Sequence, residues 1–254
     1  MMKFYKLIGV LILLILFIGC SDEDPLLPLP EVNFRTNPEI IEVGIPVVFE
    51  NLTTNASSYE WDFGDGQTST AISPIITYEE SGPYTVKLVA ITDDDQRDSL
   101  SMDIDVGERV MKELYINDIP FYNQENNDWD DPTGLPDSTK YPDLILLFGP
   151  EDSDNPDDLI ITLPVVDLAP FDMPIYYTLE GGDPYVLTDE DWVLEFYDFD
   201  GDDIENAQNE DFEIMGGATF NPVTIPTSTV NEDGEGLIQL SFNQFSIYIV
   251  FQIE

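Results

Sequence analysis

The chain has no histidine, a single cysteine and only eight basic residues among its 254 positions. Without histidine it lacks the commonest general base, every Ser-His-Asp or Cys-His catalytic arrangement and the commonest zinc ligand. One cysteine excludes an intramolecular disulfide. The basic residues are outnumbered by 52 acidic ones, which gives a formal net charge of −44 and a surface that repels nucleic acid and anionic membranes. We therefore expect a protein that is not an enzyme and has no nucleic-acid partner.

The N-terminal segment has the features of a secretion signal. Lys3 and Lys6 precede an apolar run over residues 7–19, which is too short to span a bilayer comfortably but fits a signal peptide. The run ends in Leu-Phe-Ile-Gly-Cys, which resembles the lipobox of bacterial lipoproteins. The resemblance implies that residues 1–19 are removed and that Cys20 carries acyl chains such as palmitate. The alternative is an ordinary signal peptide followed by an incidental cysteine.

The residues after Cys20 bear on the location of the protein. Residues 21–24, Ser-Asp-Glu-Asp, resemble the export signal that sends lipoproteins of Bacteroidota-type bacteria to the outer face of the outer membrane. This resemblance implies a lipid-anchored protein at the cell surface that contacts the membrane through its lipid alone. Residues 20–30 are expected to form an acidic linker that its prolines keep extended.

The most informative segment is YEWDFGDG, residues 59–66. Its aromatic residues alternate with acidic ones, as in a strand with one buried face, and its glycines favour a turn. Together with PIITYEESGPYTVKLVAITDD, residues 74–94, it resembles the polycystic kidney disease (PKD) repeat domain. The resemblance implies an immunoglobulin-like β-sandwich over residues 31–107 that acts as a spacer or binding module, although Pro83 interrupts the usual glycine-to-tyrosine step.

The turn of this segment has two possible roles. We expect the residues of the turn to be structural, with both carboxylates fastening the backbone beside a core tryptophan; they are Trp61, Asp62, Gly64, Asp65 and Gly66. The alternative is metal binding or catalysis by Asp62 and Asp65.

Residues 108–254 contain repeated short apolar segments and no helical period of any length. The expected strands are Leu114–Ile119, Leu144–Phe148, Leu159–Leu163, Ile175–Leu179, Trp192–Tyr197, Leu237–Phe242 and Phe245–Ile253. Asn243 and Gln244 separate the last two and predict a hairpin. The pattern predicts an all-β chain, in which the immunoglobulin-like PKD β-sandwich is followed by a second antiparallel β-sandwich over residues 108–254.

Acidic residues gather at two places in this second part. One is the segment DWDDPTGLPDSTKYPDLILLF, and the other is WVLEFYDFDGDD with the acids that follow it. Aspartates at positions i and i+2 leave a strand end on the same side. Crowded carboxylates repel one another unless solvent or a hard cation such as calcium screens them.

This arrangement resembles the C-two domain, a calcium-dependent β-sandwich, over about residues 110–254. The resemblance implies calcium as a cofactor, bound by Asp130 or Asp131 together with Asp143, Asp198, Asp200 and Asp211. Basic residues that would meet lipid headgroups are absent, so lipid binding is not implied. The alternative is that these acids form a solvated rim without metal.

Three functions are compatible with these features. The first is a non-catalytic cell-surface module, stabilised by calcium, that binds or displays a carbohydrate or protein partner. Exposed aromatic residues would then stack on sugar rings; the candidates are Trp129, Tyr176, Tyr177 and Tyr185. The second is a component of a surface glycan-degrading system with paired carboxylates, such as Asp198 with Asp200 or Glu195. The third is a purely structural stalk, which one sequence cannot separate from the first.

Overall fold

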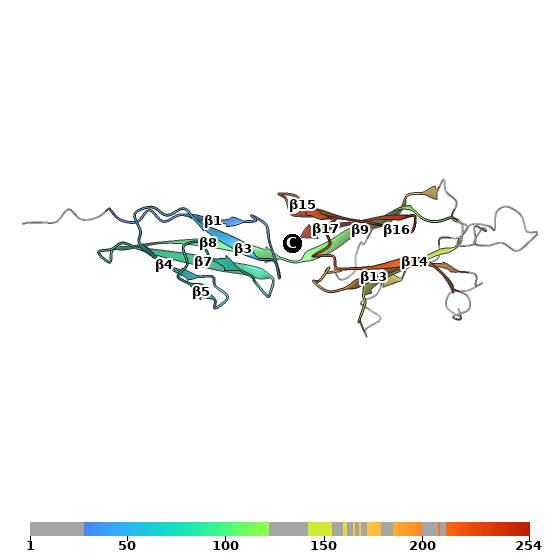
Figure 1. Cartoon of the computed structure of the whole chain (residues 1–254), viewed down its shortest axis with the longest axis horizontal. Coiled ribbons are helices and arrows are strands. Elements are labelled where there is room, and N and C mark those ends of the chain that lie inside the picture. Colours follow the sequence, from blue (N-terminus) through green and yellow to red (C-terminus); the bar gives the residue numbers. More distant parts are fainter. Residues whose placement is uncertain are drawn as a thin grey trace, which may run out of the picture.

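A computed structural model describes residues 28–121, 142–153, 160–161, 165, 168, 172–178, 185–199, 208 and 212–254. In these residues the secondary structure is almost entirely β, and two sandwiches lie end to end (Figure 1). No helix within the described ranges has the length and apolar character needed to cross a membrane. The prediction of an all-β chain, with an immunoglobulin-like sandwich followed by a second, antiparallel sandwich, is confirmed.

The first sandwich comprises strands β1 to β8. Their bounds are β1 (Phe34–Asn37), β2 (Ile41–Glu42), β3 (Val47–Asn51), β4 (Ser58–Asp62), β5 (Thr68–Ser69), β6 (Ile75–Ile76), β7 (Gly82–Ile91) and β8 (Arg97–Gly107). They form a three-stranded sheet, β1-β3-β6, and a five-stranded sheet, β2-β8-β7-β4-β5. Pro83 lies within β7 opposite Asp105, and the pairing of β7 with β8 continues without a register shift.

The second sandwich comprises strands β9 to β17. Their bounds are β9 (Arg109–Asp118), β10 (Leu144–Pro150), β11 (Ile160–Ile161), β12 (Ile175–Thr178), β13 (Trp192–Phe199), β14 (Phe212–Phe220), β15 (Ser228–Val230), β16 (Glu235–Phe242) and β17 (Phe245–Ile253). Sheet β11-β10-β13-β14 packs on sheet β12-β9-β17-β16-β15 across a core of alternating inward side chains. All the expected strands of this part are present; Phe245–Ile253 has the expected bounds and the others have altered ones. Asn243 and Gln244 form the expected hairpin turn, with φ of 41° and 72°.

Two strands, β14 and β15, were not expected. Strand β14 includes Gly216 and Gly217, which normally weaken a strand. A Cβ at Gly216 would lie 2.7 Å from the Phe245 ring, so the missing side chain lets β14 cross close to the opposite sheet. The glycines thus have a packing role that local propensity does not reveal.

The two sandwiches join directly. Strand β8 ends at Gly107 and β9 begins at Arg109, which leaves Glu108 alone between them. The amide of Glu108 donates to the carbonyl of Glu254 (2.9 Å), and the amide of Glu254 donates back to the carbonyl of Glu108 (3.1 Å). The C-terminal end of β17 therefore lies at the junction, where Figure 1 shows the C-terminus.

Candidate functional site

The turn after β4 is held by its own side chains. Asp62 Oδ1 accepts the amide of Gly64 at 3.0 Å, and Asp65 Oδ1 accepts the amide of Gln67 at 2.8 Å. Gly64 has a φ of 82°, and a Cβ there would lie 2.9 Å from the carbonyl oxygen of Thr85. In this geometry both carboxylates serve as acceptors for the backbone of the turn, and Gly66 completes it with a φ of 94°.

Beside the turn lies the aromatic core of the first sandwich. Trp61 is 2% exposed, and its Nε1 donates to the carbonyl of Ala71 at 2.9 Å. Its ring packs edge-on against Phe34, with 5.1 Å between ring centroids, and parallel to Phe63 at 6.0 Å. Buried Tyr78 donates its hydroxyl to the carbonyl of Phe63, and burial raises the pKa of this phenol. This region is a packed aromatic core.

The predicted calcium ligands are only partly described. Asp130, Asp131, Asp200 and Asp211 lie outside the described residues, as does the predicted lipidation site Cys20. Asp143 and Asp198 are neighbours at one end of the second sandwich: the amide of Asp143 donates to Asp198 Oδ1 at 2.8 Å. Asp198 is fully buried, so its carboxylate helps to tie β10 to β13. Within the described ranges no group of three or more Asp, Glu, Cys or His side chains is arranged to hold a metal.

One of the proposed catalytic carboxylate pairs is excluded by the strand that carries it. The burial of β13 alternates, with Glu195 on the outer face and Asp198 on the buried face. Tyr197 donates its hydroxyl to Glu195 at 2.6 Å. Partial burial and then this bond raise the pKa of Tyr197 to about 12. Glu195 and Asp198 therefore cannot flank one substrate, while the pair with Asp200 lies beyond the described residues.

A row of three tyrosines crosses the outer face of the five-stranded sheet of the second sandwich. Tyr176 on β12, Tyr115 on β9 and Tyr248 on β17 are directly paired in register, and we call them the tyrosine row. The rings of Tyr115 and Tyr248 stack 4.9 Å apart at 18°, and Tyr176 lies 5.7 Å from Tyr115 at 36°. Tyr176 is 66% exposed at the edge of this group.

The hydroxyl groups of the tyrosine row are available to a ligand. In the described part of the chain none of the three has a hydrogen-bond partner. Partial burial, followed by the neighbouring phenols and Glu113, raises the pKa of Tyr115. The phenol of Tyr115 is thus neutral at physiological pH, and a phenol hydroxyl can both donate and accept hydrogen bonds.

A depression of about 600 Å³ adjoins the tyrosine row on the same sheet face. It is lined by apolar Val250 and Leu237 and by polar side chains that include Lys112, Glu113 and Gln252. Val250 and Glu113 are paired partners and lie two residues along their strands from Tyr248 and Tyr115. The row and the depression therefore form one continuous surface, which we call the distal face.

The aromatic residues expected to stack on sugars differ in their exposure to solvent. Tyr176 is exposed, as expected, but Tyr177 and Tyr185 pack against the hydrophobic core, and Trp129 lies outside the described residues. Tyr115 and Tyr248 were missed. The sequence contained a signal for both tyrosines. Each lies between buried aliphatic residues in an alternating strand pattern, which predicts that its side chain points outward from a half-buried strand.

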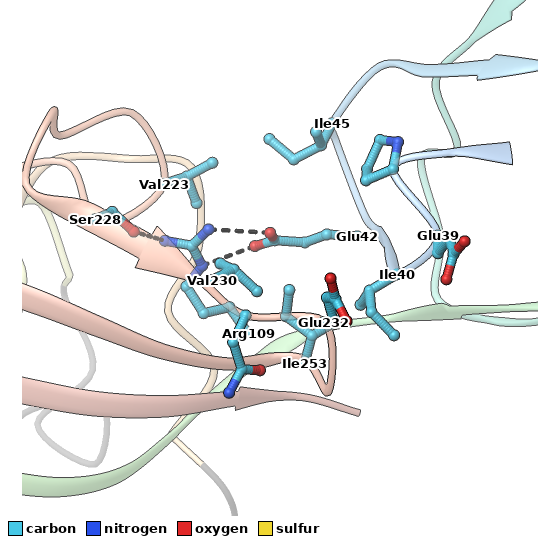
Figure 2. A pocket seen from close by; sticks show the side chains of 12 residues that line it. Glu39, Ile40, Glu42, Ile45, Arg109, Val223, Ser228, Val230, Glu232 and Ile253 are labelled. Atoms are coloured by element: carbon cyan, nitrogen blue, oxygen red, sulfur yellow. Dashed lines mark hydrogen bonds and ion pairs between the residues drawn. The ribbon is translucent and has the colours of Figure 1, made fainter.

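A second cavity, of about 630 Å³, lies between the two sandwiches (Figure 2). Arg109 of β9 enters it and forms a bidentate ion pair with Glu42 of β2, at 2.8 Å and 3.0 Å. Arg109 also donates to the hydroxyl of Ser228 and the carbonyl of Pro222, and its guanidinium lies 4.2 Å from the centre of the Phe251 ring. Because both charged side chains are buried, this ion pair joins the two sandwiches, and Arg109 is not available to bind a ligand.

Comparisons with known proteins identify the first sandwich. The model of the family described as PKD domain matches residues 28–106. Collagenase ColQ1 of Bacillus cereus is 50% identical over 44 residues, which are 17% of this chain and 4% of the collagenase. The PKD1 domain of the metalloprotease PrtV from Vibrio cholerae is 31% identical, and the match covers 31% of this chain and 98% of that domain with a TM-score of 0.28.

The similarity to whole proteins is limited. The chain spans 4% of the length of the collagenase, so the similarity concerns one domain. A structure of carbohydrate-binding modules from the β-sandwich superfamily is 13% identical, and the match covers 90% of this chain and 92% of that chain with a TM-score of 0.31. The chain contains a PKD domain within an otherwise β-rich protein.

Proposed function

We propose that the protein is a non-catalytic, lipid-anchored module of the cell surface that binds or displays a carbohydrate or protein partner. The PKD domain and the second sandwich form a rod with the buried Arg109–Glu42 pair at its junction. Such a rod holds the distal face at a defined distance from an anchor at the N-terminus. The absence of histidine and the opposite faces of Glu195 and Asp198 support a role in binding rather than catalysis.

The exposed tyrosine row is the observation that carries this proposal. Tyrosine offers a large, rigid and amphipathic contact surface at a low cost in side-chain entropy. Three such rings lie together on adjacent strands, one of them 66% exposed, and a contiguous aromatic patch of this kind marks a binding surface. Their place on paired strands keeps them preorganised.

Binding to surface material tests the function. The full-length protein would be presented with polysaccharide and protein fractions extracted separately from the surface of the cells that produce it. Saturable binding to one fraction, lost when Tyr176 and Tyr248 are both changed to alanine, is the expected result. Binding to neither fraction would remove the proposed function.

Lipid anchoring makes a separate prediction. Changing Cys20 to serine removes the only thiol that can be acylated, so the protein should move from the membrane fraction to the soluble fraction. Cell fractionation and immunoblotting measure this, and protease added to intact cells should degrade the anchored wild type. A Ser21→Ala variant is the control and should remain in the membrane fraction. Retention of the Cys20→Ser protein in that fraction would contradict the anchor.

We also propose that calcium stabilises the end of the second sandwich where Asp143 and Asp198 lie. Their contact supports this, because it brings together two of the proposed ligands from strands far apart in the sequence. Carboxylate and carbonyl oxygens suit calcium, which accepts six to eight such ligands in a flexible arrangement. Asp130, Asp131, Asp200 and Asp211 would complete the proposed site.

Calorimetry tests the calcium proposal. Calcium at about 100 times its dissociation constant stabilises a folded protein by about 2.7 kcal/mol, so the melting temperature should rise with calcium and fall again with EDTA. Asp198→Asn keeps an oxygen that can accept the amide of Asp143 but loses the charge, and it should abolish the response. Asp152→Asn, at an exposed turn after β10, is the matched control and should respond like the wild type. Identical melting of the wild type in calcium and in EDTA would end this proposal.

A further inference from the structure

We infer that the ligand of the distal face is a neutral polysaccharide, which the tyrosine row binds by stacking and the adjoining depression binds by hydrogen bonds. This inference rests on the proposed function, because it specifies the partner of a module whose binding role is itself proposed. It is carried by the ring geometry, the free phenol hydroxyls, the lining of the depression and the charge of the chain.

The tyrosine row is complementary to a ligand that has flat apolar patches and many hydroxyl groups. Tyr115 and Tyr248 are paired partners on the outer face and stack on each other, which restrains both rings. Tyr176, tilted at the edge of the sheet and 66% exposed, has ring surface left to offer. The C–H groups on the face of a pyranose carry a partial positive charge and pack on the negative face of an aromatic ring.

The surroundings of the row supply hydrogen-bonding groups in place of further apolar area. Gln239, on β16 opposite Tyr248, continues the row across the sheet, and both Gln239 and the nearby Ser241 are exposed. The depression adds the carboxylate of Glu113 and the side-chain oxygen of Gln252 beside the apolar patch of Val250 and Leu237, while the nitrogen of Gln252 donates to the carbonyl of Asp233. Its volume of about 600 Å³ lies within the range of ordinary ligand sites, and it is open along the sheet, as an extended chain requires.

The charge of the chain excludes acidic glycans. The formal net charge is −44, and carboxylates of Glu113 and Glu235 line the depression itself. Lys112, a cation in its lining, is already paired with Glu254 at 2.6 Å. Uronate or sulfate groups would therefore be repelled at this face, whereas a neutral chain is bound through contacts that salt does not screen.

A protein partner fits the distal face less well. Interfaces between proteins have a core of large apolar side chains that becomes fully buried. Among the described residues of the second sandwich, the large hydrophobic side chains that are exposed are Tyr176, Ile214 and Val230, and Ile214 lies on the opposite sheet. The distal face is thus too polar, and its exposed apolar groups too few, for such a core.

Biolayer interferometry with the immobilised full-length protein tests the inference. The probes are soluble neutral polysaccharides, namely α- and β-glucans, mannans, xylans and galactans, and the anionic polysaccharides alginate and polygalacturonate. We expect binding to at least one neutral polysaccharide and to neither anionic one. Tyr176→Ala should weaken that binding about tenfold, which corresponds to the loss of one stacking contact of about 1.4 kcal/mol. Tyr248→Ala should weaken it by a similar factor, because it removes one phenol hydroxyl and the ring that restrains Tyr115. Tyr176→Phe should keep most of the affinity because it keeps the ring.

Ile214→Ala is the control for the site, because Ile214 is 56% exposed on the opposite sheet, and it should bind like the wild type. Unchanged melting curves for the tyrosine variants would show that lost binding is not lost folding. Binding of anionic polysaccharides alone, no binding to any neutral one, or neutral binding that is indifferent to both alanine changes would overturn the inference. If the protein fraction of the cell surface binds instead, the proposed function stands and the polysaccharide assignment fails.

Discussion

Replacing Arg109 with methionine is expected to destabilise the protein by about 3–5 kcal/mol, because it leaves the carboxylate of Glu42 buried without its counter-ion. Arg109 is 4% exposed and Glu42 is 7% exposed. Methionine retains much of the aliphatic bulk beside Phe251, so the loss of charge pairing dominates over the loss of packing. The bidentate bonds at 2.8 Å and 3.0 Å are of the strong, charge-assisted kind.

Chemical denaturation measures this effect, and two controls isolate it. The double variant Glu42→Met/Arg109→Met removes both charges and should recover most or all of the lost stability, because a buried pair often contributes little beyond an apolar replacement. Arg97→Met breaks the pair between Arg97 and Glu60, whose side chains are 54% and 51% exposed, and should cost about 0–1 kcal/mol. An Arg109→Met protein as stable as the Arg97→Met protein would show that the junction is not locked by this pair.

The Arg109→Met variant also tests whether a rigid junction between the sandwiches matters for binding. The Arg109–Glu42 pair, the contacts of Glu108 with Glu254 and the direct passage from β8 to β9 join the two sandwiches. A distal face with preorganised rings gains affinity only if it is also presented to a surface ligand in a constant orientation. Loosening the junction should therefore weaken binding to a ligand fixed on a surface. Binding to the same ligand in solution should change less, since Arg109 lines the cavity at the junction and not the depression, although Val230 and Asn231 line both.

Much of this architecture could be predicted from local sequence patterns. Alternation of aromatic and acidic residues identified the strand that became β4, repeated short apolar segments identified strands such as β13 and β17, and Asn243-Gln244 identified a hairpin. Asp143 and Asp198 were expected to lie together, and their strands do pair. These features depend on neighbours along the chain or on the simple rule that apolar faces turn inward.

Other features depend on contacts between distant residues and left little local signal. Glu42 and Arg109 are 67 positions apart, and each alone looks like a surface charge until the packing of the two sandwiches buries both. Strand β14 was missed because Gly216 and Gly217 lower its strand propensity, while Gly216 serves the close approach of Phe245 from the opposite sheet. Tyr115, Tyr176 and Tyr248 become one surface only when the pairing register of β12, β9 and β17 is known.

Trp61→Ala is expected to destabilise the PKD domain by about 3–5 kcal/mol, the usual cost of removing a large aromatic side chain from a core. The indole is 2% exposed and packs on Phe34 and Phe63, so its removal leaves a cavity that rigid neighbouring rings cannot easily fill. The change also leaves the carbonyl of Ala71 without the donor Nε1 at 2.9 Å. Thermal and urea denaturation, followed by near-ultraviolet circular dichroism, measure the loss.

Comparing Trp61→Ala with a change at an exposed site on the same sandwich shows whether the loss of stability is due to lost packing. Ile75 is 64% exposed on β6, and Ile75→Ala should change stability by less than about 0.5 kcal/mol. Trp61→Phe should fall between the two, because it keeps a ring but loses the bond to Ala71. A Trp61→Ala protein that unfolds like Ile75→Ala would mean that the aromatic strand of the WDFGDG segment is not what stabilises the first sandwich. If instead the order of the three variants follows the buried area each one loses, the segment that resembles the PKD family in sequence is also the physical centre of that domain.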